Sequence, residues 1–475
     1  MSARRPAVLA AAAVLVLSGC TSFADTVTVA AASVPPSAQA EDPACPAERA
    51  RPDPDRPEVS LDFRLADDRL GVTGTETVVF TPDLDVRELV FRLVPNGPDS
   101  APAGNRLVVD GVRGDDVAAG RYEAAGAADP GGRYVVELAQ ELAAGESTEV
   151  ELDFSLTLGS GAFDRVGVDG EVSWWASGAP LLAWEPGVGW ARDPFVPLSG
   201  ETATSPAADT VVTVSAPEAL TVLMTGARAD PSAPRDGRRT WTSEEPVGRD
   251  VAVAAGPFAT TEATTPGGTR VTTGVLPGAE VSGNELTAWT TTAIGDLESF
   301  LGPFPYRTLT VALLPDFGGG IEYPSMILEA SPSREVLVHE VAHMWFYGMV
   351  GNSQFRDPWL DEAFASWAEA VVDPGSGLVN EAALTLPGAV GAPMDEFPSD
   401  GAYYRTVYDK GGAALLAAEG AAGDGAFDAA IRCYVDATAW SIATPTDVYR
   451  VLDDLPAALD VLIDAGALGK DDVPR

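Results

Sequence analysis

The chain has 475 residues, and 70 acidic against 30 basic side chains give it a formal net charge of −40. Nucleic-acid binding needs a basic surface, so this charge excludes nucleic acids as partners. It also argues against attachment to an anionic membrane through charge, and we interpret the acidic surface as a solubility feature. The sequence does not predict an oligomeric state.

Residues 1–20 have the features of an export signal. Two arginines precede the apolar run Ala7–Leu17, which is too short to span a bilayer, and the segment ends in Leu17-Ser18-Gly19-Cys20. Small residues before a cysteine at this point resemble a bacterial lipobox. We therefore predict a lipoprotein signal peptide and an exported protein, anchored to the outer face of the bacterial cell membrane only by a lipid on Cys20. The alternative is secretion, after cleavage at a site such as Ala38-Gln39-Ala40.

A tether and a β domain are predicted next. Residues 21–57 are rich in Ala, Thr, Ser and Pro without periodicity, which is typical of a flexible tether. Within residues 58–266, apolar and polar residues alternate, as in Val59–Leu65 and Val150–Leu158, and this pattern predicts β-strands. Aromatic clusters are more often core than ligand contacts, so we expect a core role for Trp174, Trp175, Trp184 and Trp190.

Residues 267–475 are expected to form a second domain of strands and helices. Strands are predicted at 269–276 and 309–314, on either side of a helix that begins at the capping-box pattern Ser282-Gly283-Asn284-Glu285. The spacing of Phe427, Ile431 and Tyr434 predicts a late helix. Strands followed by helices indicate the α+β class.

Two cysteines remain after Cys20, and their state is left open. Cys45 lies in the tether and Cys433 in the late helix. In an oxidising compartment the two can pair and fasten the N-terminal segment to the second domain. Equally, Cys433 can be a buried free thiol. Neither has the paired CxxC spacing of a structural zinc site.

The only two histidines, His339 and His343, lie in the string His-Glu-Val-Ala-His. On a helix, predicted from about Ser333 to about Tyr347, the i, i+4 spacing places both imidazoles on one face. In the HExxH pattern such rings bind Zn²⁺, and the intervening glutamate, here Glu340, is the general base. The pattern also arises by chance on ordinary amphipathic helices, so it does not identify a zinc site by itself.

A third ligand is available nearby. A catalytic zinc has three protein ligands and one open position. Glu362 lies nineteen residues after His343, in a segment where Leu360, Phe364 and Trp367 have helical spacing. A helix–loop–helix of this length can bring Glu362 back to the histidines, and Pro374 is expected to end the second helix. We predict Glu362 as the third ligand, against the alternative of a solvated carboxylate.

The stretch from His339 to Glu369 resembles the zinc site of the aminopeptidase N family of metallopeptidases, peptidase family M1. The family pattern is HExxH, eighteen intervening residues, and a glutamate within a WLNEGFA-type string, which stands here as WLDEAFA at residues 359–365. Upstream, residues 319–323 resemble the family's GAMEN string. Downstream, residues 406–411 resemble its VYEKG string.

The resemblance implies a role for several residues. Glu322 would bind the free α-amino group of a peptide, on an edge strand that includes Gly319 and Gly320. One Zn²⁺ per chain would lower the pKa of a bound water toward about 7, and Glu340 would take a proton from that water. The hydroxyl of Tyr408 would donate a hydrogen bond to the oxyanion.

Two further residues are candidates for a supporting role. Glu369 lies seven residues after Glu362, on the same helix face, where it can accept a hydrogen bond from a zinc-binding histidine or remain a solvated charge. Tyr403 matches a tyrosine of the family's site, but Tyr404 is adjacent to it.

The resemblance also implies a fold and an activity. The fold is an N-terminal antiparallel β domain followed by a thermolysin-like, mainly helical catalytic domain. Tyr323 replaces the asparagine of GAMEN, and only 67 residues follow Tyr408, so we expect a short form without the family's C-terminal helical domain. We expect a zinc-dependent aminopeptidase acting on peptides at the cell envelope. The alternatives are an endo- or oligopeptidase of the same chemistry, or a non-catalytic envelope binding protein that kept the fold.

Overall fold

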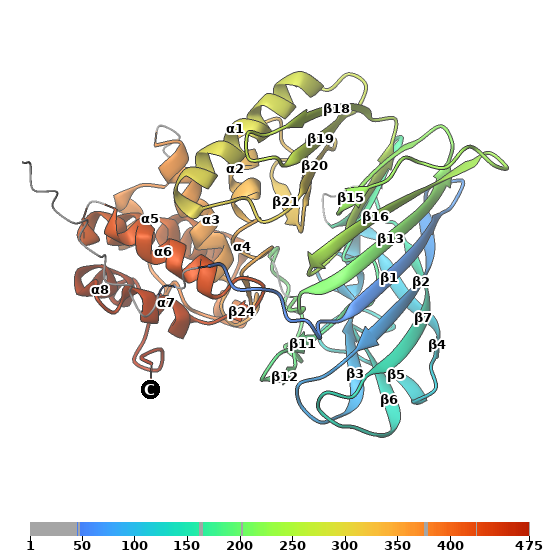
Figure 1. The fold of residues 1–475 in the computed structure, drawn as a ribbon, viewed down its shortest axis with the longest axis horizontal. Coiled ribbons are helices and arrows are strands. Elements are labelled where there is room, and N and C mark those ends of the chain that lie inside the picture. Colours follow the sequence, from blue (N-terminus) through green and yellow to red (C-terminus); the bar gives the residue numbers. More distant parts are fainter. Residues whose placement is uncertain are drawn as a thin grey trace, which may run out of the picture. The chain divides into compact units, whose positions relative to one another are not determined.

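The computed structural model describes residue 45 and residues 48–160, 165–200, 203–374, 379–423 and 425–474. The predicted signal peptide with Cys20 lies outside the described residues, as does the predicted tether except for Cys45 and residues 48–57. Within the described ranges, no helix is long and apolar enough to cross a membrane. Figure 1 shows a β-rich part followed along the chain by a part that carries the helices α1–α8.

The β-rich part follows the alternation of the sequence. On β1 (Glu58–Leu65), Leu61, Phe63 and Leu65 are at most 5% exposed, whereas the residues between them face solvent. The other strands of this part are β2 (Gly71–Phe80), β3 (Val86–Arg92), β4 (Arg106–Arg113), β5 (Val117–Glu123), β6 (Arg133–Leu142), β7 (Thr148–Thr157), β8 (Val166–Asp169), β9 (Val172–Ala176), β10 (Leu181–Leu182), β11 (Trp184–Glu185), β12 (Gly189–Trp190), β13 (Ala208–Pro217), β14 (Thr221–Met224), β15 (Ala227–Arg228), β16 (Arg238–Gly248) and β17 (Ala252–Gly256). Trp174, Trp175 and Trp184 are buried, in agreement with a core role, and Trp190 is half-buried.

These strands form three larger sheets. One has seven strands in the order β15-β16-β13-β1-β2-β7-β4, and the two four-stranded sheets run β10-β3-β6-β5 and β14-β17-β9-β8. Neighbouring strands are antiparallel, as expected, with one correction: β1 runs parallel to β13. A parallel pair needs a long crossover, and the strands β2–β12 lie between these two in the chain.

The second part contains a five-stranded sheet in the order β18-β19-β20-β22-β21. Its strands are β18 (Ala259–Thr264), β19 (Arg270–Val275), β20 (Thr308–Leu313), β21 (Gly320–Tyr323) and β22 (Met326–Glu329). The three central strands are parallel, and both edge strands are antiparallel to their neighbours. Strand β21, which carries Glu322, is therefore an edge strand. The domain boundary predicted at residues 266–267 falls inside the β18–β19 hairpin.

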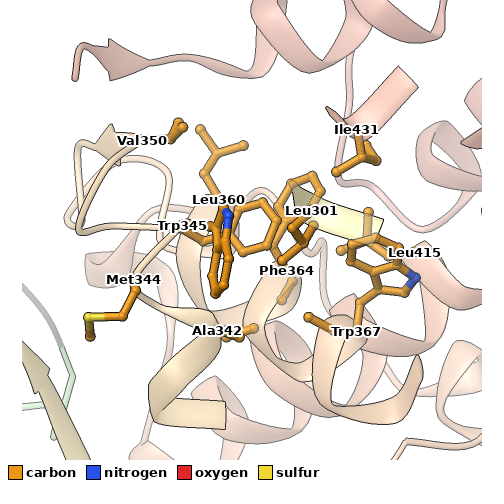
Figure 2. Close-up of a cluster of buried hydrophobic side chains, with 14 of the residues drawn as sticks. Leu301, Ala342, Met344, Trp345, Val350, Leu360, Phe364, Trp367, Leu415 and Ile431 are labelled. Carbon is orange, nitrogen blue, oxygen red and sulfur yellow. The ribbon is translucent and has the colours of Figure 1, made fainter. Parts of the chain in front are cut away.

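Helices make up most of the remaining chain. They are α1 (Gly283–Leu301), α2 (Arg334–Ala342), α3 (Trp359–Val372), α4 (Asp400–Tyr404), α5 (Gly411–Ala422), α6 (Ala426–Ala437), α7 (Pro445–Leu452) and α8 (Pro456–Asp464), and the π-helical segment η5 (Arg405–Lys410) lies between α4 and α5. The 3₁₀ turns η1 (Val94–Asn96) and η2 (Ala101–Ala103) lie in the β-rich part, and η3 (Glu381–Thr385) and η4 (Met394–Glu396) lie among the helices. The short strands β23 (Gly351–Asn352) and β24 (Ile442–Ala443) form a parallel pair. Side chains from several of these helices form one core, in which Trp345, Phe364 and Trp367 are fully buried (Figure 2). This core holds α2 against α3.

The helix that carries the histidines is shorter than predicted. It ends at Ala342 rather than near Tyr347, because the N–H groups of Met344 and Trp345 donate only three residues back, to the carbonyls of Val341 and Ala342. Tyr347 then has a left-handed backbone conformation, with φ +87°. The backbone N–H of Gly348 donates to the carbonyl of His343, and the chain then turns toward β23. His343 is consequently the last residue before the turn.

The N-terminal segment is fastened to α6. Of the two states left open for the cysteines, the structure has the disulfide, between Cys45 and Cys433. Next to it, Arg49 forms an ion pair with Asp436 at 2.8 Å, and the N–H of Ala50 donates to the carbonyl of Asp436.

Candidate active site

The two histidines converge as the i, i+4 spacing predicts. Ser333 caps α2 by accepting hydrogen bonds from the N–H groups of Glu335 and Val336. His339 on α2 and His343 at its end place their Nε2 atoms 3.1 Å apart. His343 is 1% exposed, whereas the side chain of His339 is 13% exposed.

The carboxylate of Glu362 joins them from α3. Its Oε2 lies 3.3 Å from Nε2 of His339 and 3.3 Å from Nε2 of His343, and the residue is 3% exposed. Tetrahedral zinc with metal–ligand distances of about 2.0–2.1 Å separates its ligand atoms by roughly 3.3 Å. The three donor atoms therefore fit three corners of a zinc tetrahedron. Glu362 is buried, so it is not the solvated carboxylate of the alternative interpretation.

The charges at this point favour a cation. Burial by itself lowers the pKa of His339, but hydrogen bonds with Glu362 and Glu369 outweigh it and raise the pKa to about 9. Burial likewise opposes the charge on His343, yet the carboxylate of Glu362 raises its pKa to about 9. Burial raises the pKa of Glu362, and the two histidines reverse this and hold it well below its usual range. The site stabilises positive charge where the donors meet.

The second nitrogen of each ring also has a partner. Nδ1 of His339 lies 3.5 Å from Oε2 of Glu369, and Nδ1 of His343 lies 3.3 Å from the carbonyl oxygen of Phe346. Such contacts orient a metal-binding imidazole and leave Nε2 available to the metal.

Glu340 and Glu322 lie next to the donors. Glu322, Glu340 and His343 each place one donor atom within 4.8 Å of the others, and both glutamates are at most 5% exposed. Strand β21 approaches Glu340 so closely that a Cβ atom on Gly320 would lie 2.7 Å from Cγ of Glu340. Gly319 precedes the strand in a left-handed conformation, with φ +96°.

The three tyrosines differ in position. The ring of Tyr408 stacks on His339 with centroids 5.8 Å apart and planes 9° apart. Burial and the charge of Glu362 raise the pKa of Tyr408 well above its usual value, so its hydroxyl remains a donor. Tyr403 is fully buried and packs edge-on against Tyr408, whereas the neighbouring Tyr404 faces the cavity.

A cavity of about 640 Å³ contains all these groups except Tyr403. Several of its lining residues were not anticipated from the sequence, among them Asp99 and Arg165 from the β-rich part and Phe317 before β21. No motif marks Asp99 or Arg165. Tyr404, noted from the sequence only as the neighbour of Tyr403, also lines the cavity.

A three-donor metal centre beside a buried carboxylate, at the edge of a mixed sheet, defines a metallopeptidase-type protein. The family model of the peptidase family M1 domain matches residues 322–374, a range that contains Glu322, both histidines and Glu362. This match agrees with the resemblance seen in the sequence.

Sequence relatives are aminopeptidases. Aminopeptidase M1-B of Oryza sativa subsp. japonica is 25% identical over 189 residues, 33% of this chain and 22% of that protein. Aminopeptidase N of Bos taurus is 27% identical over 266 residues, 50% of this chain and 26% of that protein. The chain thus spans about a quarter of the length of these curated relatives.

The fold has solved counterparts. A mutant M1 zinc metallopeptidase from Deinococcus radiodurans, bound to the substrate Tyr-Ser-Ala, has a TM-score of 0.62 at 18% identity and covers 88% of this chain and 96% of its own. At this identity the likeness concerns the fold. The comparisons agree with the predicted family and enzyme class: the match to the peptidase family M1 domain covers residues 322–374, and the sequence relatives are aminopeptidases.

Proposed function

We propose that this protein is a zinc-dependent aminopeptidase that removes residues from the free N-terminus of peptides. The observation that carries the proposal is the arrangement of His339, His343 and Glu362 as three corners of a tetrahedron, with Glu340 and Glu322 beside them. The names of the sequence relatives point to the same activity. A binding protein without catalysis would not need to keep these two histidines and three glutamates together.

The proposed chemistry divides among the residues of the site. His339, His343 and Glu362 would hold one Zn²⁺ per chain, which would supply a Lewis acid and lower the pKa of a bound water toward about 7. Glu340 accepts the proton of the attacking water and passes it to the leaving amine. The hydroxyl of Tyr408 donates to the developing oxyanion, a contact typically worth about 3 kcal/mol.

The charges of the cavity support an exopeptidase. Five carboxylates line it, from Asp99, Glu322, Glu340, Glu362 and Glu369, and among the described lining residues Arg165 is the one arginine. A peptide's protonated α-amine is attracted to such a cavity. Glu322 on the edge strand β21 is the carboxylate that we assign to this amine, and we assign the second part of the fold to the thermolysin-like catalytic type.

We also propose that the protein acts outside the cytoplasm. The disulfide between Cys45 and Cys433 supports an oxidising compartment. Attachment through a lipid on Cys20 extends this proposal. Cys20→Ser should release the protein from the cell surface into the medium, and continued retention in the membrane fraction would refute the lipid anchor.

One experiment tests the activity. Zinc content is measured together with hydrolysis of paired peptides, one with a free and one with an acetylated N-terminus. We expect one zinc per chain and cleavage of the free peptide alone. Cleavage of both would establish the endo- or oligopeptidase alternative, and zinc without cleavage would favour a binding protein. Glu340→Gln should retain zinc and lose hydrolysis, and Glu322→Gln should lower kcat/KM about 100-fold for free peptides.

A further inference from the structure

The hairpin β21–β22 carries Glu322, and its tight turn has a strained backbone. Ser325, in the turn, is fully buried and has φ +54°. A residue with a Cβ atom in the left-handed region costs of order 1 kcal/mol and persists only where surrounding contacts impose it. Glycine would avoid this cost, so the serine side chain must contribute something that glycine lacks.

The hydroxyl of Ser325 bridges to the β-rich part. It donates a 2.6 Å hydrogen bond to Oε2 of Glu245 on β16, and it accepts a 2.9 Å hydrogen bond from the N–H of Gly226. Glu245 is 6% exposed. Gly226 leaves no room for a side chain, because a Cβ atom there would lie 2.7 Å from the carbonyl oxygen of Glu244. The turn is thus held from two sides.

The same hairpin has a second contact with the β-rich part. The hydroxyl of Tyr323 accepts a 3.0 Å hydrogen bond from Nη1 of Arg165 and lies 3.4 Å from Oγ of Ser177. This tyrosine replaces the asparagine expected from the family string and is 1% exposed. Glu322 directly precedes it on the edge strand, so the position of Glu322 depends on how the β-rich part holds the turn.

We propose that Glu245, acting through Ser325, is a positioning residue that sets the place of Glu322 and thereby the affinity for the substrate's free amine. The proposal rests on the proposed function of Glu322. Glu245 itself lies in β16 and does not line the catalytic cavity.

The charge state of Glu245 adds a pH dependence to this contact. Burial raises the pKa of Glu245 to about 7, against the opposing effects of the Ser325 hydroxyl, the Val247 N–H and Arg307, while Asp209 raises it further. Tyr306, also buried, faces the same carboxyl. A hydrogen bond to a carboxylate is about twice as strong as one to a neutral acceptor, so the contact weakens as the pH falls through about 7.

The experiment compares Ser325→Ala, Glu245→Leu and the double variant with the wild type, on a peptide with a free N-terminus. We expect each single variant to raise KM about tenfold, with kcat changed less than twofold and zinc content unchanged. The double variant should be no worse than Ser325→Ala, because Ser325→Ala already removes the contact with Glu245. Glu244→Gln, which removes an exposed carboxylate from the same strand, is the matched control with an unchanged KM.

Glu245→Gln keeps an acceptor and removes the charge. We expect its KM to be about threefold above wild type at pH 8 and not to follow the pH dependence of Glu245, whereas the wild-type KM rises toward the variant's value as the pH falls through about 7. If Glu245 had a solely structural role, the pH dependence of KM would not differ between the wild type and Glu245→Gln. Additive effects in the double variant, or an unchanged KM in Ser325→Ala, would overturn the proposal.

Hydrogen exchange distinguishes this proposal from the function on which it rests. Ser325→Ala should speed amide exchange in residues 320–329 and leave α2 unchanged. If the wild type does not prefer a free amine, the role of Glu322 is wrong, and faster exchange in the hairpin still supports the contact from Glu245. Unchanged exchange would refute that contact.

Discussion

Gly320→Ala tests whether the edge strand sets the position of the general base. The Cβ atom of an alanine at this position would lie 2.7 Å from Cγ, 2.8 Å from Cδ and 2.8 Å from Oε1 of Glu340. Ordinary van der Waals contact begins at 3.4 Å, so the side chain of Glu340 or the strand must move by at least 0.7 Å. Glu340 is 5% exposed and lines the cavity, so a carboxylate that yields to the new methyl group leaves its place beside the zinc donors.

The expected loss follows from that displacement. A misplacement of about 1 Å in a catalytic group costs about 100-fold in rate, or about 2.7 kcal/mol of transition-state stabilisation. We expect kcat/KM of Gly320→Ala to fall by about this factor while zinc content stays at the wild-type value. The assay is steady-state hydrolysis of a peptide with a free N-terminus, with zinc measured on the same samples.

A matched glycine controls for the loss of backbone freedom. Gly295 is exposed on α1 with open space around its Cα, so Gly295→Ala should leave activity unchanged and stabilise the chain by up to about 1 kcal/mol. If Gly320→Ala retains wild-type kcat/KM, the edge strand does not set the position of Glu340, and the reasoning from this close contact is refuted.

Three further predictions concern stability. Reducing the Cys45–Cys433 disulfide, which closes a loop of 388 residues, should lower the thermal unfolding temperature. Loop entropy sets an upper limit of about 6 kcal/mol on the free energy of unfolding that is lost. An equal unfolding temperature with and without reductant would contradict this. Arg249→Met should destabilise the chain by about 3 kcal/mol in urea unfolding, because the buried guanidinium donates to four backbone carbonyls, those of Ser205, Tyr347, Met349 and Ser441. A change below 1 kcal/mol would show that these carbonyls find other donors. The pKa of Glu245 is about 7 in the folded chain against 4.5 as a free group, so the folded state binds more protons between these values and the free energy of unfolding falls as the pH rises through this window. Glu245→Gln should lose this decrease when unfolding is measured at pH 5 and pH 8, and parallel pH dependence in both proteins would refute the assignment.

The sequence predicted well those features that depend on local spacing. Helical spacing predicted that His339 and His343 share one face, because periodicity determines which side chains of a helix lie together. Predicting Glu362 as the third donor, from another helix, also needed the resemblance to the family pattern. Alternation in Val59–Leu65 predicted a half-buried strand for the same reason.

Neighbouring residues on an irregular segment were harder to assign. The sequence matched Tyr403 to a tyrosine of the family's site, with Tyr404 adjacent to it, yet Tyr403 is buried and Tyr404 lines the cavity. The π-helical segment Arg405–Lys410 follows them, and it changes the angular relation between these tyrosines and Tyr408. Helical spacing alone therefore could not tell which tyrosine reaches the cavity.

By itself, the sequence predicted the resemblance to family M1, the three candidate donor residues, and the order of a β-rich part and a mainly helical part. Only the tertiary structure decided that Asp99 and Arg165 line the catalytic cavity, that Cys45 pairs with Cys433, and that Glu245 holds the turn beside Glu322. The physical reason is sequence distance. Periodicity and motifs report contacts within a few turns of chain, whereas these contacts join segments more than 70 residues apart, and only the packing of the whole fold brings them together.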